Sequence, residues 1–294
     1  MIIVQYVPML FDTHSHIQFK SFDKNRKNVI ERAKKAGVKK IIAIGTDLES
    51  SKKAAEISIE YPEVFASVGI HPHHVFSYLS RHSEFISESY KEILKQVQDD
   101  GVGVQDDIRH LEDLFSNPKV VAVGETGMDK YQYKITKYSN YSVSKQFIKL
   151  QKEIFKMQIK LAIMYKKALI IHNREAVEET LEVLKESWDK KLEGRTVFHY
   201  CEPDKRVLDF AKSHKIYIGV DGDVLTDKIK QEFVKIIPLD LLVLETDSPF
   251  LNSEPAKIKT ILEFISKLLK IQPKGFEKIL FNNSSYLFNN YLLK

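Results

Sequence analysis

The sequence predicts a closed (β/α)8 barrel, the TIM barrel fold class, built as a single domain. Three observations support this prediction: eight short apolar runs recur along the chain, longer amphipathic segments separate them, and the chain has 294 residues. Strands that alternate with helices are typical of a parallel sheet with crossover helices. Eight such units in about 250 residues make a closed barrel. An open, doubly wound sheet of the same units is the alternative.

The predicted strands are short, and several are almost wholly apolar, as expected of strands that helices cover on both faces. They lie at residues 9–14, 38–45, 64–70, 120–124, 168–172, 196–199, 216–220 and 241–245. The predicted helices repeat apolar residues at intervals of three and four positions. The clearest of these patterns lie at residues 25–36, 50–61, 144–165, 176–187 and 204–213.

Two segments account for the roughly forty residues beyond the usual barrel length. Residues 77–107 are rich in Ser, Glu, Gln and Asp but place Phe85, Tyr90 and Leu94 at helical spacing, which predicts an inserted helical segment after the third strand. Residues 130–144 are polar and rich in tyrosine, and we expect an extended loop over the barrel mouth. We expect residues 1–8 to form an N-terminal extension and residues 9–294 to form the barrel.

The composition is that of a globular protein with a small positive charge. Hydrophobic residues make up 43% of the chain, and the net charge of +5 permits a polyanionic partner without requiring one. The single cysteine, Cys201, excludes an internal disulfide framework and favours the reducing cytoplasm. No apolar run approaches the roughly 18 residues of a membrane span, so we expect no membrane partner. We favour a monomer.

Seven residues with metal-binding side chains stand at or just beyond the C-terminal ends of predicted strands. In a barrel these ends meet at one rim, so residues far apart in the sequence become neighbours. Imidazole and carboxylate together suit zinc, manganese, iron or nickel, and the sequence therefore predicts a metal site whose metal stays open. Histidines satisfied by neighbours inside the barrel, and an ion pair between Glu125 and Arg174, are structural alternatives. The seven residues are His14, His16, His71, His172, His199, Glu125 and Asp247.

Six short segments contain these residues and their neighbours. They read Phe-Asp-Thr-His-Ser-His at 11–16, Gly-Ile-His-Pro-His at 69–73, Gly-Glu-Thr-Gly-Met-Asp at 124–129, Ile-His-Asn-Arg at 171–174, Phe-His at 198–199 and Leu-Glu-Thr-Asp-Ser-Pro-Phe at 244–250. In this order they resemble the TatD family of metal-dependent deoxyribonucleases, over essentially the chain from Met9 onward. The resemblance implies an amidohydrolase-like (β/α)8 barrel with two divalent metal ions, Mg, Mn or Zn, in each chain.

The resemblance also implies roles for single residues. His14, His16, Glu125 and Asp247 would bind one ion, and Glu125, His172 and His199 would bind the second, with Glu125 as the catalytic bridge. Asp247 would orient the attacking water and take its proton. His71 would bind or protonate a phosphate oxygen, and His73 and Arg174 would contact the substrate. The implied reaction is hydrolysis of phosphodiester bonds in DNA, as a 3′-5′ exonuclease acting on single strands or 3′ ends.

The chain departs from the family pattern in two places. The basic Arg-Gly-Lys loop that usually precedes Asn-Glu-Pro is missing, because residues 250–255 follow Pro249 at once, and Tyr200-Cys201-Glu202-Pro203 replaces the family's Cys-Phe-Ser-Gly. Two other functions therefore stay open. One is an amidohydrolase-type deacylase or amidase, since the same activated water can attack a carbonyl carbon at a C–N or ester bond. The other is a metal-binding scaffold that has lost turnover.

Overall fold

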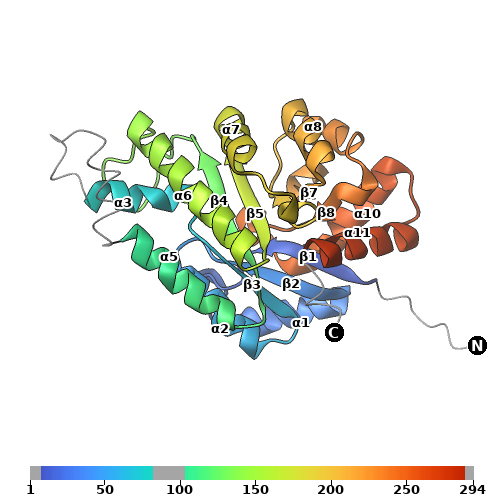
Figure 1. The fold of residues 1–294 in the computed structure, drawn as a ribbon. Helices are drawn as coiled ribbons and strands as arrows, with labels where there is room; N and C mark the ends of the chain where they lie inside the picture. Colours follow the sequence, from blue (N-terminus) through green and yellow to red (C-terminus); the bar gives the residue numbers. More distant parts are fainter. Residues whose placement is uncertain (1–7, 82–102, 289–294) are drawn as a thin grey trace, which may run out of the picture.

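A computed structural model describes residues 8–81 and 103–288 of the chain. Eight parallel strands follow one another around the sheet in sequence order, and the helices surround them (Figure 1). The ring closes where the end of the last strand meets the first: the Asp247 amide donates to the His14 carbonyl at 2.9 Å, and the His16 amide to the Ser248 carbonyl at 2.7 Å. The strands are β1 (Leu10–Ser15), β2 (Val38–Ile44), β3 (Val64–Val68), β4 (Val120–Asp129), β5 (Ala168–Arg174), β6 (Thr196–Phe198), β7 (Tyr217–Val220) and β8 (Leu242–Leu244).

Several helices begin at residues whose side chains satisfy free backbone amides. Asp47 accepts from the amide of Ser50, and Ser144 accepts from the amide of Phe147, at the starts of two long helices. The predicted barrel is confirmed, and the five clearest predicted helices each begin and end within two residues of the observed bounds. The α-helices are α1 (Arg26–Ala36), α2 (Leu48–Glu60), α3 (Phe76–Arg81), α5 (Val104–Asp113), α6 (Lys145–Met164), α7 (Val177–Ser187), α8 (Lys205–His214), α9 (Lys228–Val234), α10 (Ile258–Leu269) and α11 (Pro273–Leu287).

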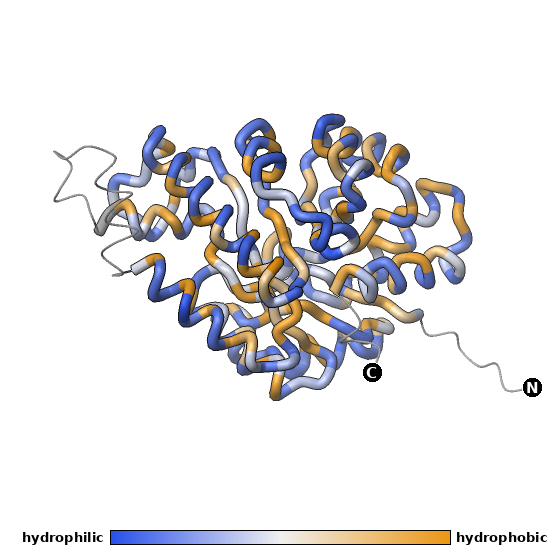
Figure 2. Tube along the Cα trace, viewed as in Figure 1, coloured by the Kyte–Doolittle hydropathy of each residue, from blue (hydrophilic) through white to orange (hydrophobic). Residues whose placement is uncertain are grey.

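The strands divide the hydrophobic core into two layers. Along β2, Ile41 and Ala43 belong to the large cluster, which also contains the buried faces of the surrounding helices, while Ile42 and Ile44 belong to a smaller one. The smaller cluster includes Phe288 just after α11, whose ring centroid lies 5.6 Å from that of Phe11. Hydrophobic residues accordingly run through the centre of the fold in Figure 2. Alternate residues of β2 thus belong to different clusters.

Strand β4 is longer than predicted and contains an irregularity. It runs to Asp129 rather than ending at Gly124, with a register shift against β5 between Val123 and Thr126. Gly124 and Gly127 have φ of 141° and 139°, a conformation that L-residues with side chains rarely adopt. The sequence prediction was wrong here because glycine indicates a strand end as readily as a bulge. Glu125 therefore lies inside the strand.

Parts of the predicted insertion and extension lie outside the described residues, namely 82–102 and 1–7. On either side of the first gap, α3 ends at Arg81 and α5 begins at Val104, and α5 buries Ile108 and Leu111 in the core. Residues 130–144 contain no helix or strand, and Tyr133 from this loop lines the pocket described below. Within the described ranges, no helix has the length and apolar character needed to cross a membrane.

Candidate metal centre

A pocket of about 660 Å³ opens where the C-terminal ends of the strands meet. Almost all the predicted site residues line it, and His14 lies buried beneath them with no exposed surface. The other lining residues are mainly aromatic or small polar side chains. The predicted residues in the wall are His16, His71, His73, Glu125, His172, Arg174, His199 and Asp247.

The first predicted ligand set converges on one point. His14 Nε2 lies 3.4 Å from Glu125 Oε2 and 3.7 Å from Asp247 Oδ1. His16 Nε2 lies 3.3 Å from the same Asp247 oxygen and 3.9 Å from the same Glu125 oxygen. The His16 ring is fixed from behind, because its Nδ1 lies 3.0 Å from the Ile44 carbonyl. Two imidazole nitrogens and two carboxylate oxygens thus face each other at distances that a cation between them would bridge.

Several of these atoms have no hydrogen-bond partner within the described part of the chain. Both ring nitrogens of His14 and Oδ1 of Asp247 are buried and form no hydrogen bond there. Buried polar atoms normally have a partner, since leaving one unpaired costs free energy. A cation would satisfy His14 Nε2 and Asp247 Oδ1 at once. This cluster therefore fits a metal ion.

Glu125 also faces the second predicted set, with its other oxygen. Its Oε1 lies 2.7 Å from Nδ1 of His172 and 3.6 Å from Nε2 of His199. His71 lies at the edge of this set, with Nε2 3.2 Å from His172 Nδ1. The two sets thus share one carboxylate group, one oxygen in each. Every residue predicted as a ligand is brought into one of the two.

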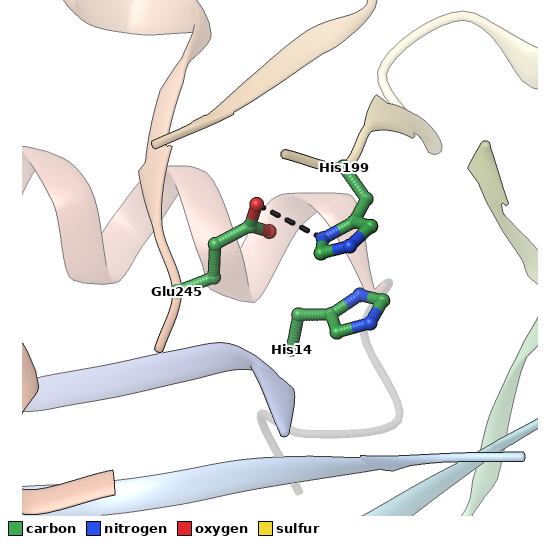
Figure 3. Close-up of side chains that lie close together, drawn as sticks. All are labelled: His14, His199 and Glu245. Carbon is green, nitrogen blue, oxygen red and sulfur yellow. Dashed lines mark hydrogen bonds and ion pairs between the residues drawn. The ribbon is translucent and has the colours of Figure 1, made fainter. Parts of the chain in front are cut away.

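Two carboxylates without a role predicted from the sequence hold the second set in place. Asp129 Oδ2 lies 3.1 Å from His172 Nε2, and Glu245 Oε1 lies 3.0 Å from His199 Nδ1. Figure 3 shows the second contact, with the His14 ring stacked beneath that of His199 at 3.4 Å between centroids. Each carboxylate orients an imidazole so that its other nitrogen faces Glu125. Both stand inside the quoted motifs, but motif position alone does not reveal this contact.

Burial and mutual charge shift the pKa values in this cluster. Burial alone would raise the pKa of Glu125, but His71, His199 and His14 hold it well below its usual value. Burial lowers the pKa of His199, yet Glu245 and Glu125 outweigh burial and raise it to about 10. Asp129 and Glu125 likewise raise the pKa of His172 to about 9 against the effect of burial. These histidines therefore hold protons beside the carboxylates, and cations that bind there would displace those protons.

The predicted substrate residues lie on the wall formed by β3, β4 and β5. The ring of His73 packs against Tyr133 at 4.5 Å, and its Nε2 lies 2.9 Å from Thr136 Oγ1. The guanidinium carbon of Arg174 lies 3.9 Å from the ring centre of Tyr131. The alternative pairing of Arg174 with Glu125 is not among the ion pairs of the described residues; Arg174 instead donates to the Tyr133 hydroxyl at 3.2 Å. The partners of Glu125 are histidines.

Comparisons with known proteins identify the family of this chain. The family model described as TatD related DNase matches residues 11–289. An uncharacterized metal-dependent hydrolase, YabD of Bacillus subtilis, is 30% identical over 290 residues, which cover 95% of this chain and 99% of the relative. The 3′-5′ ssDNA/RNA exonuclease TatD of Escherichia coli is 26% identical over 272 residues, covering 87% of this chain and 90% of the relative. The crystal structure of YJJV, a TatD homologue from Escherichia coli, has the same fold, with a TM-score of 0.74 and 23% identity over 97% of this chain and 99% of that one. The chain therefore belongs to the TatD-related DNase family and is a metal-dependent hydrolase.

Proposed function

We propose that this enzyme hydrolyses phosphodiester bonds of DNA, removing nucleotides from the 3′ ends of single strands. The observation that supports this most directly is the bridging position of Glu125, with one oxygen toward each ligand set. The name of the Escherichia coli relative, an ssDNA/RNA exonuclease, supports a nucleic-acid substrate and adds RNA to the candidates. The proposal includes a cytoplasmic location and a monomeric state.

In this proposal the chain holds two divalent ions, Mg, Mn or Zn. His14, His16, Glu125 and Asp247 would bind one, and Glu125, His172 and His199 would bind the other. When bound, the ions would supply positive charge that binds the scissile phosphate and acidifies an attacking water. Asp247, whose pKa is held low by His16 and His199 against the effect of burial, stays ionised and accepts the proton of that water.

In this proposal His71 binds the phosphate and does not protonate it. Burial and the neighbouring His172 lower its pKa well below the usual value, so its imidazole is neutral near pH 7. Its Nδ1 accepts from the His73 amide at 3.1 Å, which leaves the ring proton on Nε2, the nitrogen that faces the site. His71 therefore donates a hydrogen bond to a phosphate oxygen, and Arg174 and His73 contact the substrate beside it.

A gel assay tests the proposal. A 5′-labelled single-stranded oligonucleotide, incubated with the enzyme and Mg²⁺ or Mn²⁺, should shorten stepwise from its 3′ end, and a chelator should stop the reaction. Asp247→Asn should lower the rate about 10²- to 10⁴-fold, the usual contribution of a positioned base. Asp107→Asn is the matched control, since Asp107 accepts from the Tyr78 hydroxyl away from the pocket. Metal-loaded enzyme that leaves DNA and RNA intact but cleaves aminoacyl esters or amides would replace the proposal with the deacylase alternative.

A further inference from the structure

Three apolar side chains form one side of the pocket mouth, and we refer to Phe19, Phe250 and Leu251 as the apolar lip. All three line the pocket. Phe250 is 51% exposed and Leu251 is 47% exposed. Single exposed apolar residues are common on protein surfaces. Two of them, together with the half-buried Phe19, form a hydrophobic surface beside the pocket that a ligand can cover.

The apolar lip adjoins the first ligand set through ring contacts. The ring of Phe19 stacks on that of His16, with centroids 4.6 Å apart and an angle of 19° between planes. Phe250 stands edge-on to both rings, at 5.5 Å from His16 and 6.2 Å from Phe19. A flat group placed against the apolar lip would therefore lie beside a residue that we propose as a metal ligand.

The backbone holds the apolar lip in this position. Leu251 and Asn252 have φ of 55° and 48°, a left-handed conformation that costs free energy in residues other than glycine. The Phe250 amide donates to the Asp247 carbonyl at 2.9 Å, and Lys257 Nζ donates to the Asn252 carbonyl at 2.6 Å. The turn that presents Phe250 and Leu251 to solvent is thus built directly on the residue proposed as the base.

Lysine and arginine are scarce among the side chains that line this pocket. Arg174 is the single lysine or arginine in the described pocket wall, and it stacks on Tyr131. Proteins that follow a single strand through its phosphates use a groove rich in lysine and arginine. Residues 250–255, which follow Pro249 on the side of the apolar lip, contain no lysine or arginine. Away from the proposed ions, uncharged contacts must therefore supply much of the binding in this part of the pocket.

We propose that the apolar lip binds one unpaired nucleobase of the substrate, next to the scissile phosphodiester, by stacking against Phe250. This inference rests on the proposed nuclease function. Stacking on an aromatic ring tolerates any base, because every base has a flat π face. The apolar lip therefore selects for an unpaired base rather than for a sequence, which fits single strands and frayed 3′ ends.

A binding experiment that needs no turnover tests this inference. The probe is 2-aminopurine deoxyribonucleoside 5′-monophosphate, which contains no phosphodiester bond and whose fluorescence falls on stacking. With Mg²⁺ present, the wild type should quench the probe, and Phe250→Ala should raise its Kd roughly 5- to 150-fold, the range measured for loss of one base stack. Phe250→Trp should bind about as well as the wild type. Tyr286→Ala, which removes another exposed aromatic ring, 64% exposed on α11, should leave the Kd unchanged.

The outcomes separate this inference from the proposed function. Equal Kd values for Phe250→Ala and the wild type, or no quenching by the wild type, would overturn the apolar lip as a base site, even if oligonucleotides are cleaved. Quenching that depends on Phe250 in an enzyme that cleaves no oligonucleotide would keep the nucleotide site and refute the nuclease function. The metal content of the wild type and the three variants is measured as a control. Equal content would show that a change in Kd does not arise from loss of metal from the ligand sets.

Discussion

Replacing Asp129 by asparagine tests whether the carboxylate behind His172 tunes the proposed metal centre. Asp129 has no exposed surface, and it accepts hydrogen bonds from the Tyr133 hydroxyl at 2.8 Å and the Tyr131 amide at 2.8 Å, with His172 Nε2 at 3.1 Å. Gln151 fixes its backbone through bonds to both the amide and the carbonyl at 2.9 Å. Asparagine has the same shape and keeps this backbone position, but it offers one acceptor oxygen and no charge.

The expected loss follows from the contact with His172. A carboxylate that accepts from a ligating imidazole raises the basicity of the other nitrogen, and removing such a partner typically costs 10- to 100-fold in metal affinity. This range corresponds to about 1.4–2.7 kcal/mol of binding free energy. The second ligand set should bear the whole loss, because Asp129 makes no contact with His14, His16 or Asp247 among the described interactions.

Competition against a fluorescent chelator measures this loss for Zn²⁺ or Mn²⁺. The wild type should show two binding steps, and Asp129→Asn should weaken one of them by the expected factor while the other stays unchanged. Asp107→Asn is the control, because Asp107 makes the same carboxylate contact with a tyrosine hydroxyl, at 2.6 Å from Tyr78. A change of less than threefold in both steps of Asp129→Asn, or an equal loss in Asp107→Asn, would refute the reasoning.

Three further predictions concern salt, burial and pH. Raising KCl from 50 to 300 mM should weaken oligonucleotide binding, and a plot of the logarithm of the binding constant against the logarithm of the salt concentration should have a slope shallower than about −2. Each neutralised phosphate of a single strand contributes about −0.7 to this slope, and Arg174 is the one lysine or arginine in the described pocket wall. A slope of about −4 in a filter-binding titration would contradict the charge argument. Lys230→Met should destabilise the fold by about 3–5 kcal/mol in urea unfolding, because buried Asp221, 3.3 Å from the Lys230 ammonium, would lose its cation. Adding Asp221→Asn to this variant should restore much of the lost stability. A Lys230→Met variant as stable as the wild type would refute the role of this ion pair. His172 and Asp129 pair in the metal-free enzyme, and although burial acts in the other direction, His172 lowers the pKa of Asp129 to about 2, below that of the unfolded chain. This pairing should contribute about 2–3 kcal/mol to the free energy of unfolding above pH ~4, and this contribution should disappear as the pH falls toward ~2. The stability gap between wild type and Asp129→Asn, compared in urea at pH 7 and pH 3 without metal, should therefore narrow at pH 3, and a constant gap would count against the pairing.

The positions of the predicted ligands could be inferred from the sequence because two simple patterns determine them: the alternation of side chains along a strand and the alternation of strands with helices along the chain. His14 in β1 and His16, one residue beyond its end, face the same Asp247 oxygen because side chains two apart on an extended segment point the same way. The parallel order of the strands brings the distant histidines to one rim. The barrel itself followed from counting alternating segments. These features depend on local pattern and on fold class, both of which a single sequence contains.

The contacts behind the ligands could not be predicted in the same way. Asp129 reaches His172 because β4 pairs with β5 after a register shift, which places Gly127 beside His172 and Asp129 beside Arg174. The stacking of Arg174 on Tyr131 depends on the path of an irregular loop. Register shifts and loop paths arise from packing between segments far apart in the chain, and spacing within one motif does not encode them.

The bridging position of Glu125 depends on glycines as much as on the carboxylate itself. A Cβ atom at Gly69 would lie 2.7 Å from the Gly124 backbone, and one at Gly124 would lie 2.7 Å from the Ile170 carbonyl oxygen, so β3, β4 and β5 approach closely only without side chains there. The Glu125 amide donates to the Gly45 carbonyl at 3.0 Å, which fixes the residue at this level. Both ligand sets share this one carboxylate, with contacts of 2.7 Å to His172 and 3.4 Å to His14. A shift of β4 by about an ångström would therefore loosen both sets together.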